Sequence, residues 1–246
     1  MPSPRQRTRM RAFTLVELLV VIAIIAVLAG LVVSAVSGAG VKGRQSACIS
    51  NMRQIGAALI LYANDNEGNY PETTHTTGVK IRRAWIFTLK PYLANCDAVR
   101  ISPADPLGAA RLKANATSYI LNSYVFVPQV GPFGEMGEAL NNMRRLPFVE
   151  HTILAFNISD QQSPSVMNDH THSDLWQGNW KRFCADTQPD RHRSGAASKD
   201  NTKGSANYLY ADGHVRNIEA AEVKRQIDRG VAFAKPPIER KDLDNQ

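Results

Sequence analysis

Hydrophobic positions along this chain follow two patterns in succession. The first is an unbroken run, since no residue from Leu18 to Val41 is charged, which gives 24 uncharged positions rich in Leu, Val, Ile and Ala. As a helix that rises about 1.5 Å per residue, this run exceeds the roughly 30 Å hydrocarbon core of a bilayer. It therefore predicts one membrane span, over residues 13–36.

The second pattern is an amphipathic repeat. Apolar side chains recur at intervals of 4, 3, 4 and 3 residues, which places them on one face of a helix: Cys48, Met52, Ile55, Leu59 and Tyr62. The repeat ends before Gly68 and Pro71, residues that stop a helix. We expect one long helix over 13–66, whose amphipathic half, 44–66, packs against a globular domain.

Residues 67–246 are expected to form a head domain of short strands and turns. The clearest strand signal is the alternation on either side of Asp212-Gly213, a pair typical of β-hairpin turns. The hairpin strands are expected over 207–210 and 215–218, and two further strands over 118–127 and 152–156. Residues 85–89 fit either a strand or a helical turn. A short helix is expected over 219–229. These elements predict an α+β fold, with the long helix packed on a mainly antiparallel sheet.

The N-terminal flank of the expected span is basic. Residues 1–12 contain four arginines and no acid, and such flanks stay cytoplasmic. We expect them to form a cytoplasmic leader, and the chain beyond the span to be exported to the periplasm. Glu17, at the front of the span, would cost about 3 kcal/mol in lipid unless it is interfacial or paired. An ordinary signal anchor and a cleaved secretory signal peptide remain alternatives at this point.

The order Arg-Ala-Phe-Thr-Leu-Val-Glu-Leu-Leu-Val-Val-Ile-Ala over residues 11–23 resembles the class III signal of type IV pilins and type II secretion pseudopilins. The resemblance implies that a prepilin peptidase cleaves between Ala12 and Phe13, and that the new amino terminus of Phe13 is methylated. The family usually has glycine where this chain has Ala12. The resemblance also makes Glu17 an assembly residue that pairs with that amino terminus on a neighbouring subunit. A carboxylate buried among apolar helices needs such a partner to offset its desolvation.

The same resemblance implies a pilin-like fold and a fibre-forming function. The chain would be a structural subunit of a pseudopilus or type IV pilus-like fibre, and a role in type II protein secretion is one outcome. Its partners would be the prepilin peptidase, the bacterial inner membrane, and copies of itself or other pilin-like subunits contacted through the N-terminal helix.

Further segments resemble one branch of this family, the large prepilin-like proteins of planctomycetes. They are residues 46–56, 63–71, 102–106 and 118–122, and a C-terminal motif of His192, Asp212 and Gly213. Two departures are evident. Ser102 stands where those proteins have cysteine, and 19 residues rather than nine separate His192 from Asp212. The additional residues, over 194–204, have the composition of a loop. Such an insertion would leave the hairpin intact, but it leaves the role of His192 open.

Three cysteines follow the span: Cys48, Cys96 and Cys184. They would face an oxidising periplasm, where disulfides persist. Their odd number leaves at least one of them unpaired or bonded to another chain. The sequence does not decide between one disulfide and three buried free thiols. Cys96 could replace the cysteine that the branch has at position 102.

The net charge argues against nucleic-acid binding. The formal charge of +7 falls to +3 once the four leader arginines are removed, because 25 basic residues then face 22 acidic ones. That excess is too slight for a nucleic-acid surface. No Gly-x-Ser-x-Gly elbow and no phosphate-binding glycine loop occurs. We therefore expect a protein that is not an enzyme.

Some residues suit a metal ion, although we expect no firm metal site and no cofactor. His170 and His172 are spaced to place two imidazoles on one face of a strand, where His192 or His214 could add a third ligand. The carboxylates that suit Ca²⁺ are those of Asp169, Asp174 and Asp212.

Two functions of another class remain alternatives. One is a signal-anchored periplasmic module that never polymerises and binds a glycan on exposed aromatic side chains: Trp176, Trp180 and Tyr208. These side chains suit a core equally well. The other is a metal-dependent periplasmic hydrolase, which would hold stoichiometric zinc.

Overall fold

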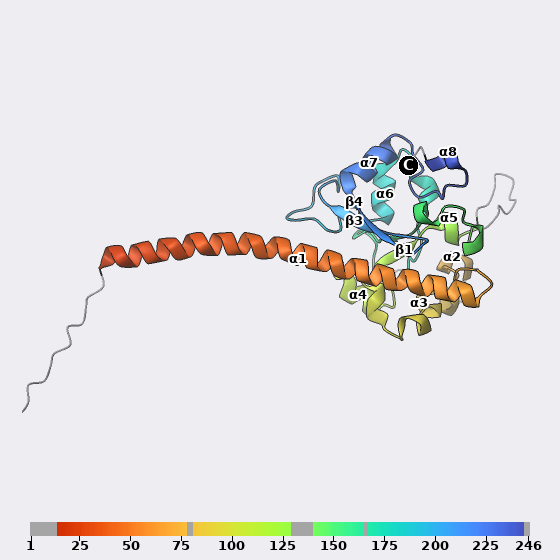
Figure 1. Ribbon diagram of the computed structural model, residues 1–246, viewed down its shortest axis with the longest axis horizontal. Helices are drawn as coiled ribbons and strands as arrows, with labels where there is room; N and C mark the ends of the chain where they lie inside the picture. Colours follow the sequence, from red (N-terminus) through yellow and green to blue (C-terminus); the bar gives the residue numbers. More distant parts are fainter. Residues whose placement is uncertain (1–13, 78–80, 129–139, 165–166, 244–246) are drawn as a thin grey trace, which may run out of the picture. The chain divides into compact units, whose positions relative to one another are not determined.

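The computed structural model describes residues 14–77, 81–128, 140–164 and 167–243, except the side chains of residues 31–37 and 81. The chain divides into two compact units, residues 1–40 and 41–246. Helix α1 (Leu15–Asp65) contributes to both (Figure 1). It lies within the expected helix over 13–66, and Phe13 falls outside the described residues.

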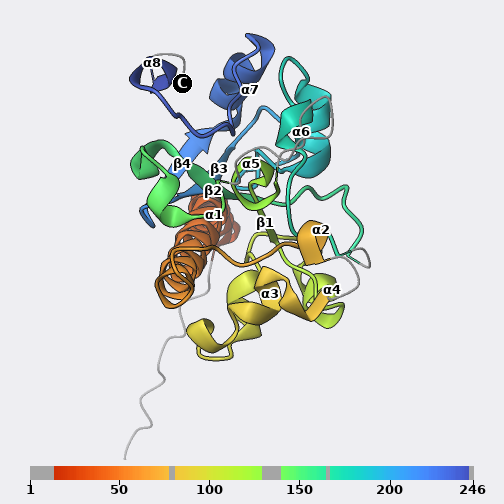
Figure 2. The same cartoon turned by 90° about the vertical axis from the view of Figure 1, so that its right-hand side faces the viewer.

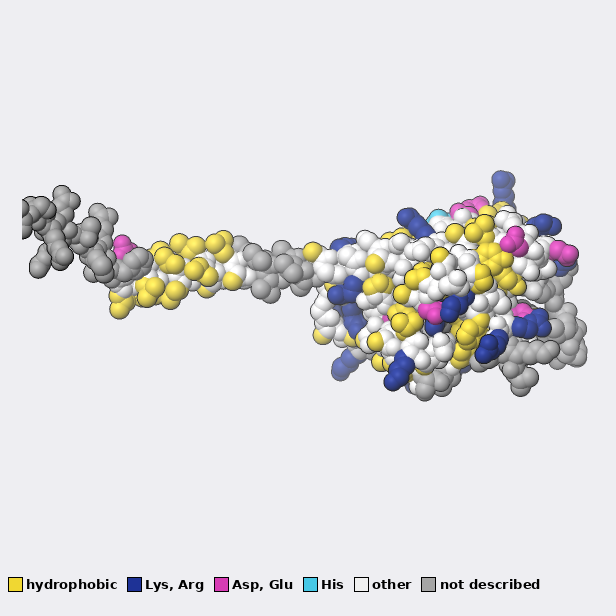
Figure 3. Space-filling view, turned by 90° about the horizontal axis from the view of Figure 1, so that it is seen from below, with side chains coloured by type: hydrophobic (Ala, Val, Ile, Leu, Met, Phe, Trp, Pro, Cys, Tyr) yellow, Lys and Arg dark blue, Asp and Glu magenta, His cyan; other side chains and the backbone are white. Residues whose placement is uncertain are grey.

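In the first unit, the apolar side chains of α1 are uncovered. Large hydrophobic residues from Leu15 to Leu28 are 44–76% exposed, and Figure 3 shows hydrophobic side chains along this part of the helix. No helix in the described part of the chain is both long enough and apolar enough to cross a membrane. The span over 13–36 stays a prediction.

The second unit, which we call the head, contains a four-stranded antiparallel sheet in the order β1-β2-β3-β4. The strands are β1 (Tyr119–Leu121), β2 (Ile153–Asn157), β3 (Ser205–Tyr210) and β4 (Val215–Glu219). β3 and β4 form the hairpin predicted around Asp212-Gly213, with Leu209 opposite Val215. The sheet and α1 confirm the α+β fold.

The remaining helices are short. They are α2 (Thr74–Thr77), α3 (Trp85–Thr88), α4 (Gly108–Lys113), α5 (Ser123–Phe126), α6 (Trp180–Asp186), α7 (Ala220–Asp228) and α8 (Arg240–Leu243). Turns of 3₁₀ helix occur at Ile81–Arg83, Pro91–Leu93, Asp97–Arg100, Met143–Arg145, Val149–His151 and Ser173–Leu175. Thus 85–89 is a helical turn rather than a strand, and the short helix expected over 219–229 is α7.

The sheet separates two hydrophobic cores, because alternate residues of a strand point to opposite faces. The first core joins the apolar face of α1 to one face of the sheet: Cys48, Met52, Ile55, Leu59, Tyr119, Leu121, Leu154 and Leu209. The second joins the other face to α6 and α7: Ile120, Phe156, Tyr208, Phe183, Val223 and Ile227. Figures 1 and 2 show α1 on one side of the sheet and α6 and α7 on the other.

Residues 118–127 form a shorter strand than the sequence predicts, because Asn122 ends β1. The Asn122 Oδ1 accepts a hydrogen bond from Tyr124 N at 3.1 Å and so caps α5. Its Nδ2 donates to Ile153 O and Ala234 O, at 2.7 Å each. A buried asparagine that bonds the backbone in this way replaces the strand with a turn.

Leu59→Ala tests the packing of α1 on the sheet. Leu59 is completely buried, so its truncation should lower the free energy of unfolding by about 2–5 kcal/mol. The control is Leu61→Ala, since Leu61 lies on the same helix but is 52% exposed, and it should change stability by less than about 0.5 kcal/mol. Urea unfolding of the full chain in detergent measures both. Equal losses from the two variants would contradict this packing.

Candidate functional site

Glu17 is held by the residue that precedes its own helix. Thr14 donates to Glu17 Oε2 from its backbone N at 2.9 Å and from Oγ1 at 2.8 Å, and Glu17 N donates to Thr14 Oγ1 at 3.2 Å. This reciprocal arrangement is the capping box Ser/Thr-x-x-Glu, which satisfies free N–H groups at a helix start. The spacing of Thr14 and Glu17 was the sequence signal for it, and the sequence interpretation missed it.

The predicted processing residues Ala12 and Phe13 lie outside the described residues. Glu17 itself is exposed, on a stretch of α1 whose side chains are otherwise apolar. Both hydrogen bonds that its carboxylate accepts from described residues go to Oε2. Oε1 is therefore the carboxylate oxygen that accepts none from them.

His192, the first residue of the C-terminal motif, is 7% exposed and lies beside β3. Its backbone N donates to Ser205 O at 2.8 Å, and its Nε2 is 3.0 Å from Asn207 Nδ2. Because an amide nitrogen donates, Nε2 accepts, which places the imidazole proton on Nδ1. Burial lowers the pKa of His192 to about 4, with smaller contributions from the positive charges of Arg191, Lys42 and Arg44. The imidazole is therefore neutral near pH 7.

Asn207 connects His192 to α1 and to both neighbouring strands. Its Nδ2 also donates to Gln45 O of α1 at 3.2 Å. Its Oδ1 accepts from Asn217 Nδ2 of β4 at 2.9 Å, and its backbone O accepts from Asn157 Nδ2 of β2 at 3.0 Å. The start of β3 is thus fastened to the long helix.

Asp212 and Gly213 lie past the opposite end of β3, so the structure does not bring them to His192. Asp212 Oδ1 accepts from His214 N at 3.0 Å and lies 2.6 Å from His214 Nδ1. Gly213 has a φ of +89°, which favours glycine, and it approaches α1 at Gly56 and Ile60. The three motif residues therefore mark the two ends of one strand, each end lying against α1.

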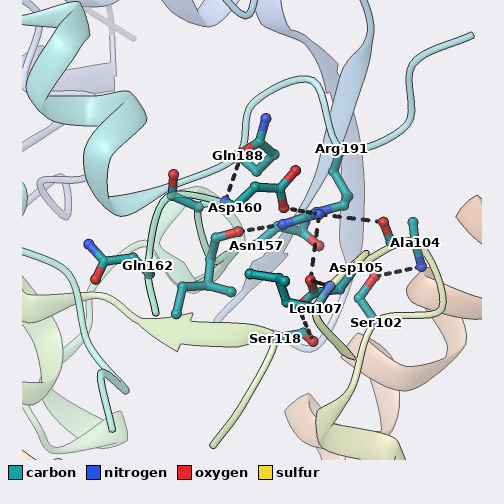
Figure 4. A network of polar contacts seen from close by, with 12 residues as sticks. Ser102, Ala104, Asp105, Leu107, Ser118, Asn157, Asp160, Gln162, Gln188 and Arg191 are labelled. Carbon is teal, nitrogen blue, oxygen red and sulfur yellow. Dashed lines mark hydrogen bonds and ion pairs between the residues drawn. The ribbon is translucent and has the colours of Figure 1, made fainter. Parts of the chain in front are cut away.

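A buried cluster of charges joins the 102–106 turn to the segment that ends at His192 (Figure 4). Asp105 accepts from Arg111 Nε at 2.9 Å and from Ser118 Oγ at 2.6 Å. Arg191 donates from Nη1 to Asp160 Oδ1 at 2.6 Å, and the same Nη1 lies 4.0 Å from Asp105 Oδ1. The side chains of Asp105 and Arg111 are fully buried. The sequence interpretation missed both arginines, because charged residues carry no sequence signal of burial.

The histidine pair expected on a strand lies elsewhere. His170 makes one isolated bridge to Leu121 and His172 belongs to no strand, so the two imidazoles do not share the strand face that their spacing allowed. The histidine that lies beside this pair is His75, rather than His192 or His214. The His75–His170 ring centroids are 5.3 Å apart and the His170–His172 ring centroids are 5.4 Å apart. His192 lies instead against Asn207 and His214 against Asp212.

The three carboxylates considered for calcium lie in different parts of the head and do not share a site. Asp169 is buried and accepts from Thr74 N at 3.0 Å, from Thr74 Oγ1 at 2.6 Å and from His170 Nδ1 at 3.0 Å. Asp174 lies on an exposed 3₁₀ turn and Asp212 in the hairpin turn. Across the described ranges, no three His, Cys, Asp or Glu side chains are grouped so as to hold a metal ion. Calcium binding stays a prediction.

The three cysteines are all free thiols, so none of the disulfides left open by the sequence is present. Cys48 and Cys184 are buried and Cys96 is exposed. In the first core Cys48 Sγ lies 3.4 Å from Tyr119 Oη and 3.6 Å from Asn157 Oδ1.

The aromatic residues considered for glycan binding do not form an exposed platform. Trp176 and Tyr208 are each only 1% exposed and belong to the second core. Trp180 stacks on Phe183 at 5.2 Å and donates from Nε1 to Asp200 O at 2.7 Å. The expectation that they are exposed is wrong for Trp176 and Tyr208.

Comparison with known proteins gives the family. A family model described as the prokaryotic N-terminal methylation motif matches residues 7–33, which include Ala12, Phe13 and Glu17. The type II secretion system core protein G of Escherichia coli (strain K12) is 34% identical over 136 residues, which cover 54% of this chain and 89% of that protein. The chain belongs to the type II secretion pseudopilins. This confirms the pilin-like family expected from the N-terminal sequence.

Two further pseudopilins are similar. The core proteins G of Pectobacterium carotovorum subsp. carotovorum and Dickeya chrysanthemi are each 35% identical, over 103 and 104 residues. The matches cover 41% of this chain and 64% and 65% of those proteins, so the chain spans just under two thirds of their length. No solved structure matches the chain significantly. The narrower resemblance to planctomycete proteins is not tested by these matches.

Asp105→Ala tests the buried charge cluster of this pseudopilin. The change leaves the fully buried Arg111 without its carboxylate, so it should lower the free energy of unfolding by about 3–5 kcal/mol. Glu72→Ala is the control, because the Glu72–Arg83 pair has side chains 37% and 60% exposed and should contribute less than about 1 kcal/mol. Urea unfolding compares them, and a small loss for Asp105→Ala would contradict the role of the cluster.

His192 predicts a pH dependence of stability. Its pKa is lowered to about 4 in the fold, against about 6.5 in an unfolded chain. The unfolded chain thus binds more protons between these values, so stability should fall as pH drops from about 6.5 to about 4. The loss should be on the order of 3 kcal/mol. His192→Gln should flatten this part of the profile of melting temperature against pH, and the exposed-histidine control His151→Gln should not. An unchanged profile in His192→Gln would contradict the assignment.

Proposed function

We propose that this chain is a pseudopilin subunit that is cleaved between Ala12 and Phe13, methylated at Phe13, and assembled into a type II secretion pseudopilus through α1. The first part of α1 anchors it in the inner membrane before assembly, and the head faces the periplasm. Its role is structural, and no catalytic role is assigned to it.

The observation that carries this proposal is that the methylation motif includes an uncovered apolar stretch of α1. The motif covers residues 7–33, and the large hydrophobic residues from Leu15 to Leu28 are 44–76% exposed in the single chain. So much apolar surface is unfavourable in water. Lipid covers it before assembly, and the helices of neighbouring subunits cover it in a fibre, where close packing and polar pairs supply the affinity.

Glu17 supports assembly rather than anchoring alone. The carboxylate sits among apolar side chains, and Oε1 accepts no hydrogen bond from the described residues. The methylated amino terminus of a neighbouring Phe13 is a cation, which is the partner that such an oxygen favours.

The glycan-binding alternative receives no support from the head. Its proposed stacking residues Trp176 and Tyr208 are buried in the second core, so no sugar ring can reach them in this fold.

Glu17→Ala tests the assembly role in cells that contain a prepilin peptidase and a secretion machine. Wild-type chain and variant should both start at N-methyl-Phe13, by intact mass and N-terminal sequencing. The variant should yield at least ten-fold fewer sheared fibres, because the neighbour's amine loses its carboxylate. Fibre yield is measured by electron microscopy and immunoblotting.

Two controls separate the possible causes. Glu222→Ala removes an exposed acid from α7 and should leave fibres unchanged. Thr14→Ala removes the helix cap, worth about 1 kcal/mol, but keeps Glu17, so fibres should persist. A wild-type start at Met1 or near Ala39 would overturn the processing, and normal fibres from Glu17→Ala would overturn the pairing.

A further inference from the structure

A polar cavity that opens to the surface of the head is lined in part by the segment that carries His192. It has a volume of about 390 Å³. Four parts of the head line it: the beginning of the head portion of α1, the 103–106 turn, Asp160, and the segment 191–195. Its charged lining residues are Arg44, Asp105, Asp160, Arg191 and Arg193.

The carboxylates in this lining are already neutralised. Asp105 is bound by Arg111 at 2.9 Å, and Asp160 by Arg191 at 2.6 Å. Neither carboxylate is therefore available to neutralise the other arginines.

Two arginines are left with weak pairing or none. Among the described residues Arg193 has one ion pair, to Asp190, at 3.4 Å. Arg44 is exposed and is in no ion pair with any described residue. The two come from different elements, α1 and the 191–195 segment, so the cavity has guanidinium groups on two of its walls.

Two of the lining residues, Arg191 and His192, each carry a buried nitrogen atom without a hydrogen-bond acceptor among the described residues. Arg191 Nε and His192 Nδ1 have no hydrogen-bond partner among the described residues, and both residues are more than nine-tenths buried. Buried donors without acceptors are rare and costly. In addition, Arg191, Lys42 and Arg44 each lower the pKa of His192, which is the effect of an excess of positive charge around this ring.

We propose that this cavity binds the phosphate group of an anionic ligand. Guanidinium groups bind phosphate through charge-assisted, often bidentate hydrogen bonds. A tetrahedral phosphate directs its oxygens to several sides, which suits arginines that come from different elements, whereas a planar carboxylate suits one arginine. The cavity is large enough for a phosphate that carries a small substituent.

Two sources can supply this phosphate: a free phosphate ion and the headgroup of an acidic phospholipid. The second source rests on the proposed membrane anchorage. Lys42 comes directly after the 24 uncharged residues that end at Val41, and Arg44 follows two positions later. If that run crosses the bilayer, these residues reach the level of the headgroups on the far side. The anion site itself does not depend on this anchorage.

Phosphate binding by the full chain in detergent tests the site. The probe is inorganic phosphate, followed by isothermal titration calorimetry. The wild type should bind it saturably, and Arg44→Gln and Arg193→Gln should each weaken binding about ten-fold. The matched controls are Arg53→Gln, an exposed arginine on the same helix as Arg44, and Arg145→Gln, an exposed arginine on a 3₁₀ turn. Both should bind as the wild type does.

Lipid nanodiscs separate the two sources. The full chain is reconstituted in phosphatidylcholine nanodiscs with or without phosphatidylglycerol, and retained lipid is measured by native mass spectrometry. Preferential retention of phosphatidylglycerol that Arg44→Gln and Arg193→Gln abolish supports the lipid source. Saturable phosphate binding without that preference supports the free ion.

The proposal is overturned if the wild type does not bind phosphate saturably. It is also overturned if Arg53→Gln and Arg145→Gln weaken binding as much as Arg44→Gln and Arg193→Gln do, because the effect would then be one of net charge. Melting temperatures of all four variants show that each is folded. If the chain isolated from cells does not start at N-methyl-Phe13, the proposed function is refuted, but the result of the phosphate titration is unaffected.

Discussion

The close contact between α1 and the β3–β4 hairpin is the constraint on which the head depends. Gly56 makes it possible, because a Cβ at this position would lie 2.9 Å from Leu209 Cδ1 and 3.4 Å from Gly213 Cα. The start of β3 is fastened to the same helix through Asn207 and Gln45. With the hairpin held at both ends, one face of the sheet completes a core with α1 and the other is left for α6 and α7.

This contact gives a structural account of the C-terminal motif. His192 and Asp212-Gly213 do not meet; they lie near opposite ends of β3, and each end is placed against α1. The length of the loop between them is then of little consequence, since a surface loop can be lengthened at small entropic cost. The 19 residues between His192 and Asp212 in this chain are therefore compatible with the hairpin.

Elements with local, periodic signals could be predicted from the sequence. The face of α1, the hairpin and α7 all follow from spacing within a few residues of each other. The burial of Asp105, Arg111 and Arg191 could not be predicted, because it depends on segments up to 86 residues apart that only the fold brings together. The same holds for His75 beside His170. Between the two environments that suit Trp176 and Tyr208, an exposed platform and a core, the sequence could not decide for this reason, and the fold covers both faces of the sheet.

The capping box at the start of α1 has a consequence for the lifetime of a fibre. In the single chain the Glu17 carboxylate already holds hydrogen bonds from Thr14. In the proposed fibre, a subunit that separates from its neighbours would keep these two hydrogen bonds to its Glu17 carboxylate. Dissociation then carries less of a penalty than the loss of an ion pair alone would impose.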